Sequence, residues 1–123
     1  SPGAHPISFL REQLTRRGIL AARALERTEN GQKVRVAGLV ICRQRPGTAK
    51  GVMFITLEDE TGFANFVVMP DLRKNLRGVL RAPLLLLEGI VEREGAVINV
   101  LVRGAEALDL AGQQICGQSR DFR

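Results

Sequence analysis

The stretch GVMFITLEDETG, at residues 51–62, decides the fold because it has the pattern of a half-buried β-strand closed by an acidic turn. From residue 52 to residue 58 the side chains alternate between two faces, as they do along a strand. The apolar face holds Met53, Ile55 and Leu57, and the opposite face holds Phe54, Thr56 and Glu58. An aromatic ring beside a hydroxyl on an outer face can serve as a base-stacking platform. The strand therefore indicates a surface for single-stranded nucleic acid.

A basic segment, RQRPGTAK at residues 43–50, precedes this strand. Its cations are Arg43, Arg45 and Lys50, and we expect them to contact phosphate groups, although a solvated loop is a simpler explanation that stays open. Across residues 11–50 there are ten Lys or Arg and three Glu, in a whole chain of net charge +5. The positive charge is thus concentrated before and around the first strand. Solvated helix surface also accounts for the five arginines between residues 11 and 27.

The composition is that of a soluble single-domain protein. The chain has 123 residues, of which 45% are hydrophobic and 25% charged, enough for one hydrophobic core. No apolar run approaches the roughly 20 residues of a membrane helix, and no secretion signal opens the sequence, so we expect a cytoplasmic location and no membrane partner. Cys42 and Cys116 follow no metal-ligand spacing. Reduced thiols are the simplest interpretation, with a disulfide between them left open.

Short helical segments are expected in a lead-in that covers residues 1–31. It holds Pro6 at a first helical position, Phe9, Leu10 and Leu14 on one helical face, and Gly18 at the end of that helix. Residues 21–29 can form a second helical segment before an Asn-Gly turn dipeptide.

From residue 32 the periodicity changes from helical to alternating, which predicts a barrel over residues 32–110. The expected strands cover residues 34–43, 52–58, 63–69, 84–92 and 96–102, with one helix at 72–80 between the third and the fourth. Gly38 predicts a bend in the first strand, and Phe66 is expected in the core. This order is that of the OB-fold, a mainly β, five-stranded Greek-key barrel whose second and third strands commonly bind oligonucleotides. Residues 111–123 are interpreted as a tail.

Several segments carry a more specific resemblance. They are HP and FLR at residues 5–6 and 9–11, VAGLV at 36–40, RQRPGTAKG at 43–51, FITLEDETG at 54–62 and SRDF at 119–122. Together they resemble the C-terminal OB domain of bacterial C-family replicative polymerases, closest to the error-prone, damage-tolerance branch of the polymerase III alpha subunit. The resemblance covers nearly the whole chain. It implies a non-catalytic module of a larger DNA polymerase whose nucleotidyl-transfer acids lie in another domain.

Part of the pattern is shared with the anticodon-binding OB domains of class II tRNA synthetases. In those domains an aromatic residue of the second strand stacks on a base and a polar residue of the third strand reads a base edge, which implies these roles for Phe54 and Asn65. The error-prone polymerases usually carry Trp where this chain has Met69, so Phe54 is the main stacking candidate. The expected nucleic-acid-binding residues are Arg43, Arg45, Lys50, Phe54, Thr56, Asn65 and Met69.

The function that the resemblance implies is binding of single-stranded template DNA during translesion synthesis, together with the rest of the polymerase chain. Two alternatives stay open. One is a protein-docking module for mutasome accessory proteins or, indirectly, the sliding clamp; the other is a domain like those that bind tRNA anticodons. The alternative to stacking by Phe54 is that the lead-in helix or another polymerase domain covers its ring.

No catalytic, metal or cofactor site is expected. The only histidine, His5, stands beside a proline near the start of the chain, and the sequence has no phosphate-binding loop, dinucleotide motif or zinc spacing. The acidic run at residues 58–60 is interpreted as turn chemistry, with Asp59 accepting from backbone amides before Gly62, in preference to a metal site.

Overall fold

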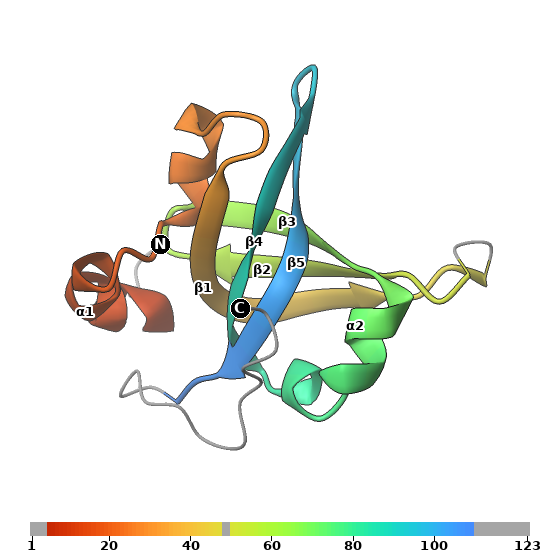
Figure 1. Cartoon of the computed structure of the whole chain (residues 1–123). Helices are drawn as coiled ribbons and strands as arrows, with labels where there is room; N and C mark the ends of the chain where they lie inside the picture. Colours follow the sequence, from red (N-terminus) through yellow and green to blue (C-terminus); the bar gives the residue numbers. More distant parts are fainter. Residues whose placement is uncertain (1–4, 48–49, 110–123) are drawn as a thin grey trace.

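The computed structural model describes residues 5–47 and 50–109, so the predicted tail at 111–123 lies outside the described residues. Five strands close into a barrel in the order β1-β2-β3-β5-β4 (Figure 1). They are β1 (Lys33–Gln44), β2 (Met53–Asp59), β3 (Gly62–Val68), β4 (Leu84–Glu94) and β5 (Val97–Ala107). Neighbouring strands are antiparallel except β3 and β5, which are parallel. The barrel is the OB-fold that the sequence predicted.

The opening stretch forms β2 and its turn. β2 and β3 pair along their whole length without a register shift, as a tight hairpin requires. Ile55 and Leu57 are each 1% exposed and lie in the barrel core beside Phe66. The alternation of faces predicted for this hairpin is therefore confirmed, and so is the core position of Phe66.

Two glycines let barrel strands bend where another strand lies close. A Cβ on Gly38 would lie 2.8 Å from the carbonyl oxygen of Glu58, and the register of β1 shifts shortly after it. A Cβ on Gly89 would overlap the carbonyl oxygen of Leu101, and β4 has its own register shift immediately before that glycine. Bulges of this kind add the curvature that closes a small barrel, and the predicted bend at Gly38 is confirmed.

The helix predicted at residues 72–80 is shorter and divided. α2 covers Pro70–Asn75, and the 3-10 helix η4 covers Val79–Arg81 after a turn. Leu76 and Leu80 of the predicted apolar stripe are nevertheless buried in the barrel core. Gly78 lies in the turn between the two helices, and its poor helix propensity favours the break.

β5 is longer than the predicted strand at 96–102. Its pairing with β4 continues past Gly104, and Ala105 and Ala107 are each 1% exposed. A glycine inside a strand locally disfavours the strand. The tertiary pairing with β4 overrides that local preference.

The lead-in consists of η1 (Pro6–Leu10), α1 (Arg11–Arg16) and η2 (Ala22–Arg27), and packs beside β1 (Figure 1). Its predicted apolar face is partly wrong, because Phe9 is 74% exposed whereas Ile7 is fully buried with Leu10 and Leu14. Ile7, Leu10 and Leu14 are three and then four residues apart, and this spacing fits one helical face as well as the predicted set with Phe9 does. Gly18 ends this part of the chain with φ of +76°, a conformation that favours glycine.

The buried face of the lead-in forms a second hydrophobic cluster outside the barrel. Its members from the barrel and from the residue that follows β5 are Ala37, Leu84, Leu86 and Leu108. This cover explains why all four leucines at residues 84–87 are buried although alternate residues of a strand point to opposite faces. Among the described residues, no helix is long and apolar enough to span a membrane.

Candidate nucleic-acid interface

The outer face of β2 and β3 presents a small apolar and polar surface, which we call the platform. Phe54 and Phe63 are 39% and 62% exposed, and Thr56 and Asn65 lie between them. Thr56 pairs directly with Asn65, and Phe54 pairs with Val67. Neither ring is covered by the lead-in in the described part of the chain, since both remain open to solvent. The platform can therefore offer two aromatic faces with a polar pair between them.

The polar pair on the platform is oriented by a hydrogen bond. The hydroxyl of Thr56 donates to Oδ1 of Asn65 at 3.0 Å. Because the Asn65 oxygen is engaged, the amide NH₂ of this exposed side chain is the group left to donate to a base edge. Side-chain amides read base edges through such donors, so the predicted role of Asn65 fits the geometry.

Phe63 extends the platform toward the hairpin between β4 and β5, which projects from the barrel in Figure 1. A hollow of about 550 Å³ lies between them, with Asn65, Val97 and Ile98 in its lining and the η2 residues Arg23 and Glu26 at its border. Phe63 is not among the site residues predicted from the sequence. Its position two residues before Asn65 on one strand was the signal that could have found it.

The basic segment does not share the platform. Gln44 pairs with Phe54, whereas Arg43 pairs with Ile55, whose side chain is in the core. Paired residues point to the same side of a sheet, so the Arg43 side chain leaves β1 on the side opposite the Phe54 ring. Its guanidinium donates from Nε to the carbonyl of Leu80 at 2.9 Å and from Nη2 to that of Ala82 at 2.8 Å. Arg43 is thus held against η4.

Lys50 and Met69 lie where the loop before β2 approaches the start of α2, since a Cβ on Gly51 would lie 3.3 Å from Cβ of Pro70. Lys50 is exposed, with φ of +54° in the loop before β2. Met69 is 47% exposed and immediately precedes α2. Met69 directly follows Val68, which pairs with Met53 where β2 begins and β3 ends.

Five arginines gather where the end of β1 meets α2 and η4, and we call this group the arginine hollow. Its lining residues are Arg43, Arg45, Arg73, Arg77 and Arg81, with Met53 and Leu80 as apolar members, around about 430 Å³. Sequence reasoning missed the last three arginines. Their spacing of four residues along the predicted helix was the available signal, because residues four apart share one helical face.

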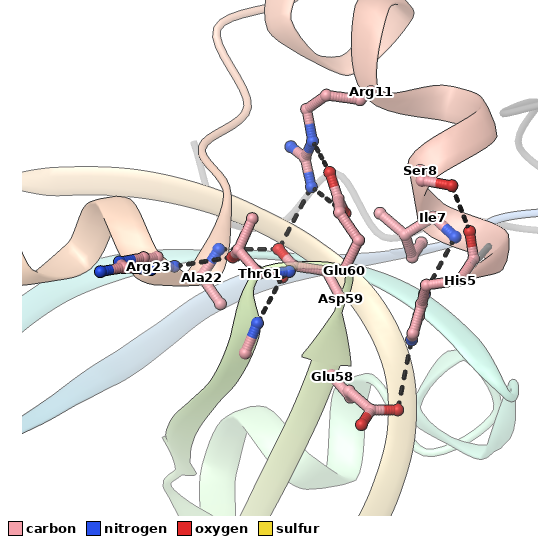
Figure 2. A network of polar contacts seen from close by, with 11 residues as sticks. His5, Ile7, Ser8, Arg11, Ala22, Arg23, Glu58, Asp59, Glu60 and Thr61 are labelled. Carbon is pink, nitrogen blue, oxygen red and sulfur yellow. Dashed lines mark hydrogen bonds and ion pairs between the residues drawn. The ribbon is translucent and has the colours of Figure 1, made fainter. Parts of the chain in front are cut away.

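The acidic turn belongs to the scaffold (Figure 2). Asp59 is 3% exposed and its Oδ1 accepts from the N–H groups of Thr61 and Gly62 at 2.7 and 3.2 Å, as the sequence predicted. Its Oδ2 accepts from the N–H of Ala22 at 2.7 Å and from Arg11 Nη2 at 3.2 Å. One buried carboxylate therefore closes the β2–β3 turn and also ties the lead-in to the barrel.

The two carboxylates beside Asp59 also contact the lead-in, Glu60 through the same Arg11 and Glu58 through His5 (Figure 2). Glu60 accepts from Arg11 Nε at 2.7 Å, and this hydrogen bond holds the pKa of Glu60 below its usual range. Glu58 Oε1 lies 3.2 Å from Nε2 of His5, while Nδ1 of the same ring accepts from the N–H of Ile7. The only histidine thus caps the start of η1. Within residues 5–47 and 50–109, no group of three or more His, Cys, Asp or Glu could hold a metal ion.

Comparison with known proteins supports the predicted resemblance. The chain is 50% identical over 119 residues to an error-prone DNA polymerase of Anaeromyxobacter dehalogenans, and 47% identical over 123 residues to one of Azoarcus sp.. These matches cover 96% and 99% of this chain. The chain spans only 10% and 12% of the two relatives' lengths. No family model matches the chain.

Solved structures share the fold at low sequence identity. Asparaginyl-tRNA synthetase from Pyrococcus horikoshii, complexed with asparaginyl-adenylate, aligns with 79% of this chain at a TM-score of 0.62 and 22% identity, over 23% of its own length. The OBody AM3L15 bound to hen egg-white lysozyme aligns with 75% of this chain at a TM-score of 0.60 and 17% identity, over 94% of its own length. These similarities confirm the OB-like barrel.

Proposed function

Because this chain is homologous, over nearly all of its length, to a domain-sized segment of the error-prone DNA polymerases, we propose that it is a non-catalytic OB module that binds single-stranded template DNA during translesion synthesis. In this role the module holds the template while catalysis takes place in other domains of the polymerase.

The platform is the observation that carries this proposal. Two exposed rings, Phe54 and Phe63, flank the hydrogen-bonded pair of Thr56 and Asn65 on the face formed by β2 and β3. OB-folds use this face for oligonucleotides, and aromatic side chains that stack on bases without sequence preference suit a template of any sequence. In the proposed complex Phe54 stacks on one base and Asn65 donates to a base edge.

Contacts to the DNA backbone come from the basic segment at the end of the barrel where β2 begins, beside the platform and not on it. Lys50 and Arg45 are exposed and make no ion pair within the described residues. They are therefore available to phosphates, which makes binding weaker as salt rises. Met69 contributes apolar contact at the edge, and because its side chain is not aromatic, more of the stacking falls to Phe54.

Fluorescence anisotropy with a labelled oligo-dT tests the proposal. We expect Phe54→Ala to raise the dissociation constant about 5- to 160-fold, because stacking of one base on an aromatic ring contributes about 1–3 kcal/mol. Phe9→Ala is the matched control, since Phe9 is 74% exposed but lies on the lead-in. Absence of saturable binding at low salt, or equal affinity of the two variants, would contradict the proposal. Tighter binding of an RNA of the same length would favour the anticodon-domain alternative.

The docking alternative has one observation in its favour. Phe9 is the most exposed of the large hydrophobic side chains in the described residues, and it lies on η1 of the lead-in and not on the platform strands. A pull-down of accessory proteins with the chain and with its Phe9→Ala variant tests this function, and repeating it without residues 111–123 tests the predicted tail. Loss of capture in either variant, with DNA affinity unchanged, would favour docking.

A further inference from the structure

The arginine hollow lies on the opposite side of the β1–β2 pair from the platform. Met53 lines the hollow and the next residue, Phe54, stands on the platform. Side chains of consecutive strand residues point to opposite faces. The hollow and the platform are therefore two separate surfaces that meet at the start of β2.

The charge in the hollow is uncompensated within the described residues. None of its lining residues is acidic, and the ion pairs formed elsewhere in the described chain involve none of the five arginines. Guanidinium groups keep their charge at any physiological pH. Gathering five of them in one concave place raises the electrostatic energy of the empty site, and a bound anion lowers it.

Two of the arginines in the hollow are held by the surrounding structure. Arg43 is fixed by its two hydrogen bonds to the carbonyls that end η4, and Arg73 is half-buried on α2. A planar guanidinium held in place can bind phosphate oxygens through two parallel hydrogen bonds. The apolar side chains of Met53 and Leu80 in the lining offer no donor, and they suit contact with sugar carbons.

From this geometry we propose that the arginine hollow is a phosphate site distinct from the platform, and that it takes closely spaced phosphate groups. The five cations carry more positive charge than one singly charged phosphodiester can neutralise. The hollow, at about 430 Å³, has room for more than one phosphate. Because the platform is a neighbour, we take these phosphate groups to belong to the backbone of the DNA strand that the platform binds. Beyond the base stacked on Phe54, that strand passes around the start of β2 into the hollow. This choice of source rests on the proposed function, whereas the anion site itself does not.

The test compares two double variants that remove the same charge. Arg73→Ala/Arg77→Ala removes two members of the hollow, and Arg27→Ala/Arg103→Ala removes two exposed arginines that lie outside it. We measure the affinity for inorganic tripolyphosphate by calorimetry and the affinity for labelled oligo-dT across a salt series. Far-UV circular dichroism checks folding, and the single change Arg77→Glu at an exposed position replaces the hollow variant if that variant does not fold.

We expect the hollow variant to bind tripolyphosphate at least 10-fold more weakly than the control variant. In the salt series we expect its slope of log K against log salt to be smaller by about 1.4, because each phosphate contact to a single strand contributes about 0.7. Phe54→Ala should weaken DNA binding without changing tripolyphosphate affinity. A reduced affinity for tripolyphosphate with unchanged DNA binding supports a site for free polyphosphate and rejects the backbone as its source. Equal behaviour of the hollow and control variants toward both probes would overturn the site, whether or not the platform binds DNA.

Discussion

Replacement of Asp59 with Asn tests whether one carboxylate joins the lead-in to the barrel. The buried Asp59 accepts hydrogen bonds from Thr61, both N–H and hydroxyl, and from Gly62 at Oδ1, and from Ala22 and Arg11 at Oδ2. An Asn side chain keeps only one acceptor oxygen. If that oxygen stays with the turn, the new NH₂ group faces the N–H of Ala22 and the guanidinium of Arg11, so that donors oppose donors.

The expected cost follows from the bonds that are lost. Each hydrogen bond to a charged group contributes about 1.5–3 kcal/mol, and two of them disappear. Arg11 keeps its contact with Glu60, which limits the damage. We therefore expect Asp59→Asn to lower the free energy of unfolding by about 3–5 kcal/mol, a range that matches the breaking of a buried ion pair.

Urea unfolding monitored by far-UV circular dichroism measures this loss, since the chain has no Trp or Tyr for fluorescence. Glu60→Gln is the matched control, because it removes the other carboxylate partner of Arg11 at a more exposed position and should cost less than about 1 kcal/mol. A loss below about 1 kcal/mol for Asp59→Asn, or equal losses for the two variants, would refute the assignment of Asp59 as the joining residue.

Three further outcomes are expected. Gly89→Ala should lower the free energy of unfolding by about 2 kcal/mol or more, because its Cβ would overlap a carbonyl oxygen of β5. Gly78→Ala, at a position in open space with ordinary backbone angles, should leave that free energy unchanged or raise it slightly in the same urea assay. The arginine partner lowers the pKa of Glu60, so the stabilisation from this ion pair is complete above about pH 4.5 and is lost as the pH falls through the folded-state pKa. The free energy of unfolding of Glu60→Gln should therefore depend less on pH below about 4.5 than that of the unchanged chain, and an equal dependence would contradict this. Leu14→Ala should cost about 2.5–5 kcal/mol and Phe9→Ala less than about 0.5, and thermal melts that show similar losses would contradict the observed packing of the lead-in.

The faces of the hairpin were predictable because they depend on local geometry. Alternation alone placed Ile55 and Leu57 in the core and Phe54 outside, and an Asp before a Thr-Gly turn predicted the hydrogen bonds of Asp59. In the lead-in the same kind of argument was ambiguous. Two apolar faces have helical spacing there, and only the packing against β1, β4 and Leu108 selects Ile7 over Phe9.

The candidate site was predictable in part. The sequence identified Phe54, Thr56 and Asn65, which the structure brings together on the platform. It also grouped Arg43 with Phe54 because they are near in the chain. The structure separates them, since the register of β1 against β2 puts their side chains on opposite sides of the sheet.

The sequence by itself determined which segments are strands, which side chains of the β2–β3 hairpin face the core, and that an aromatic strand follows a basic segment. These properties depend on periodicity and turn chemistry within about ten residues. Only the tertiary structure decided that Arg43 and Arg45 face α2 and η4, where they line one hollow with Arg73, Arg77 and Arg81. The physical reason is that strand register and helix packing are set by contacts between residues far apart in the chain, and no local pattern records which distant charges those contacts bring together.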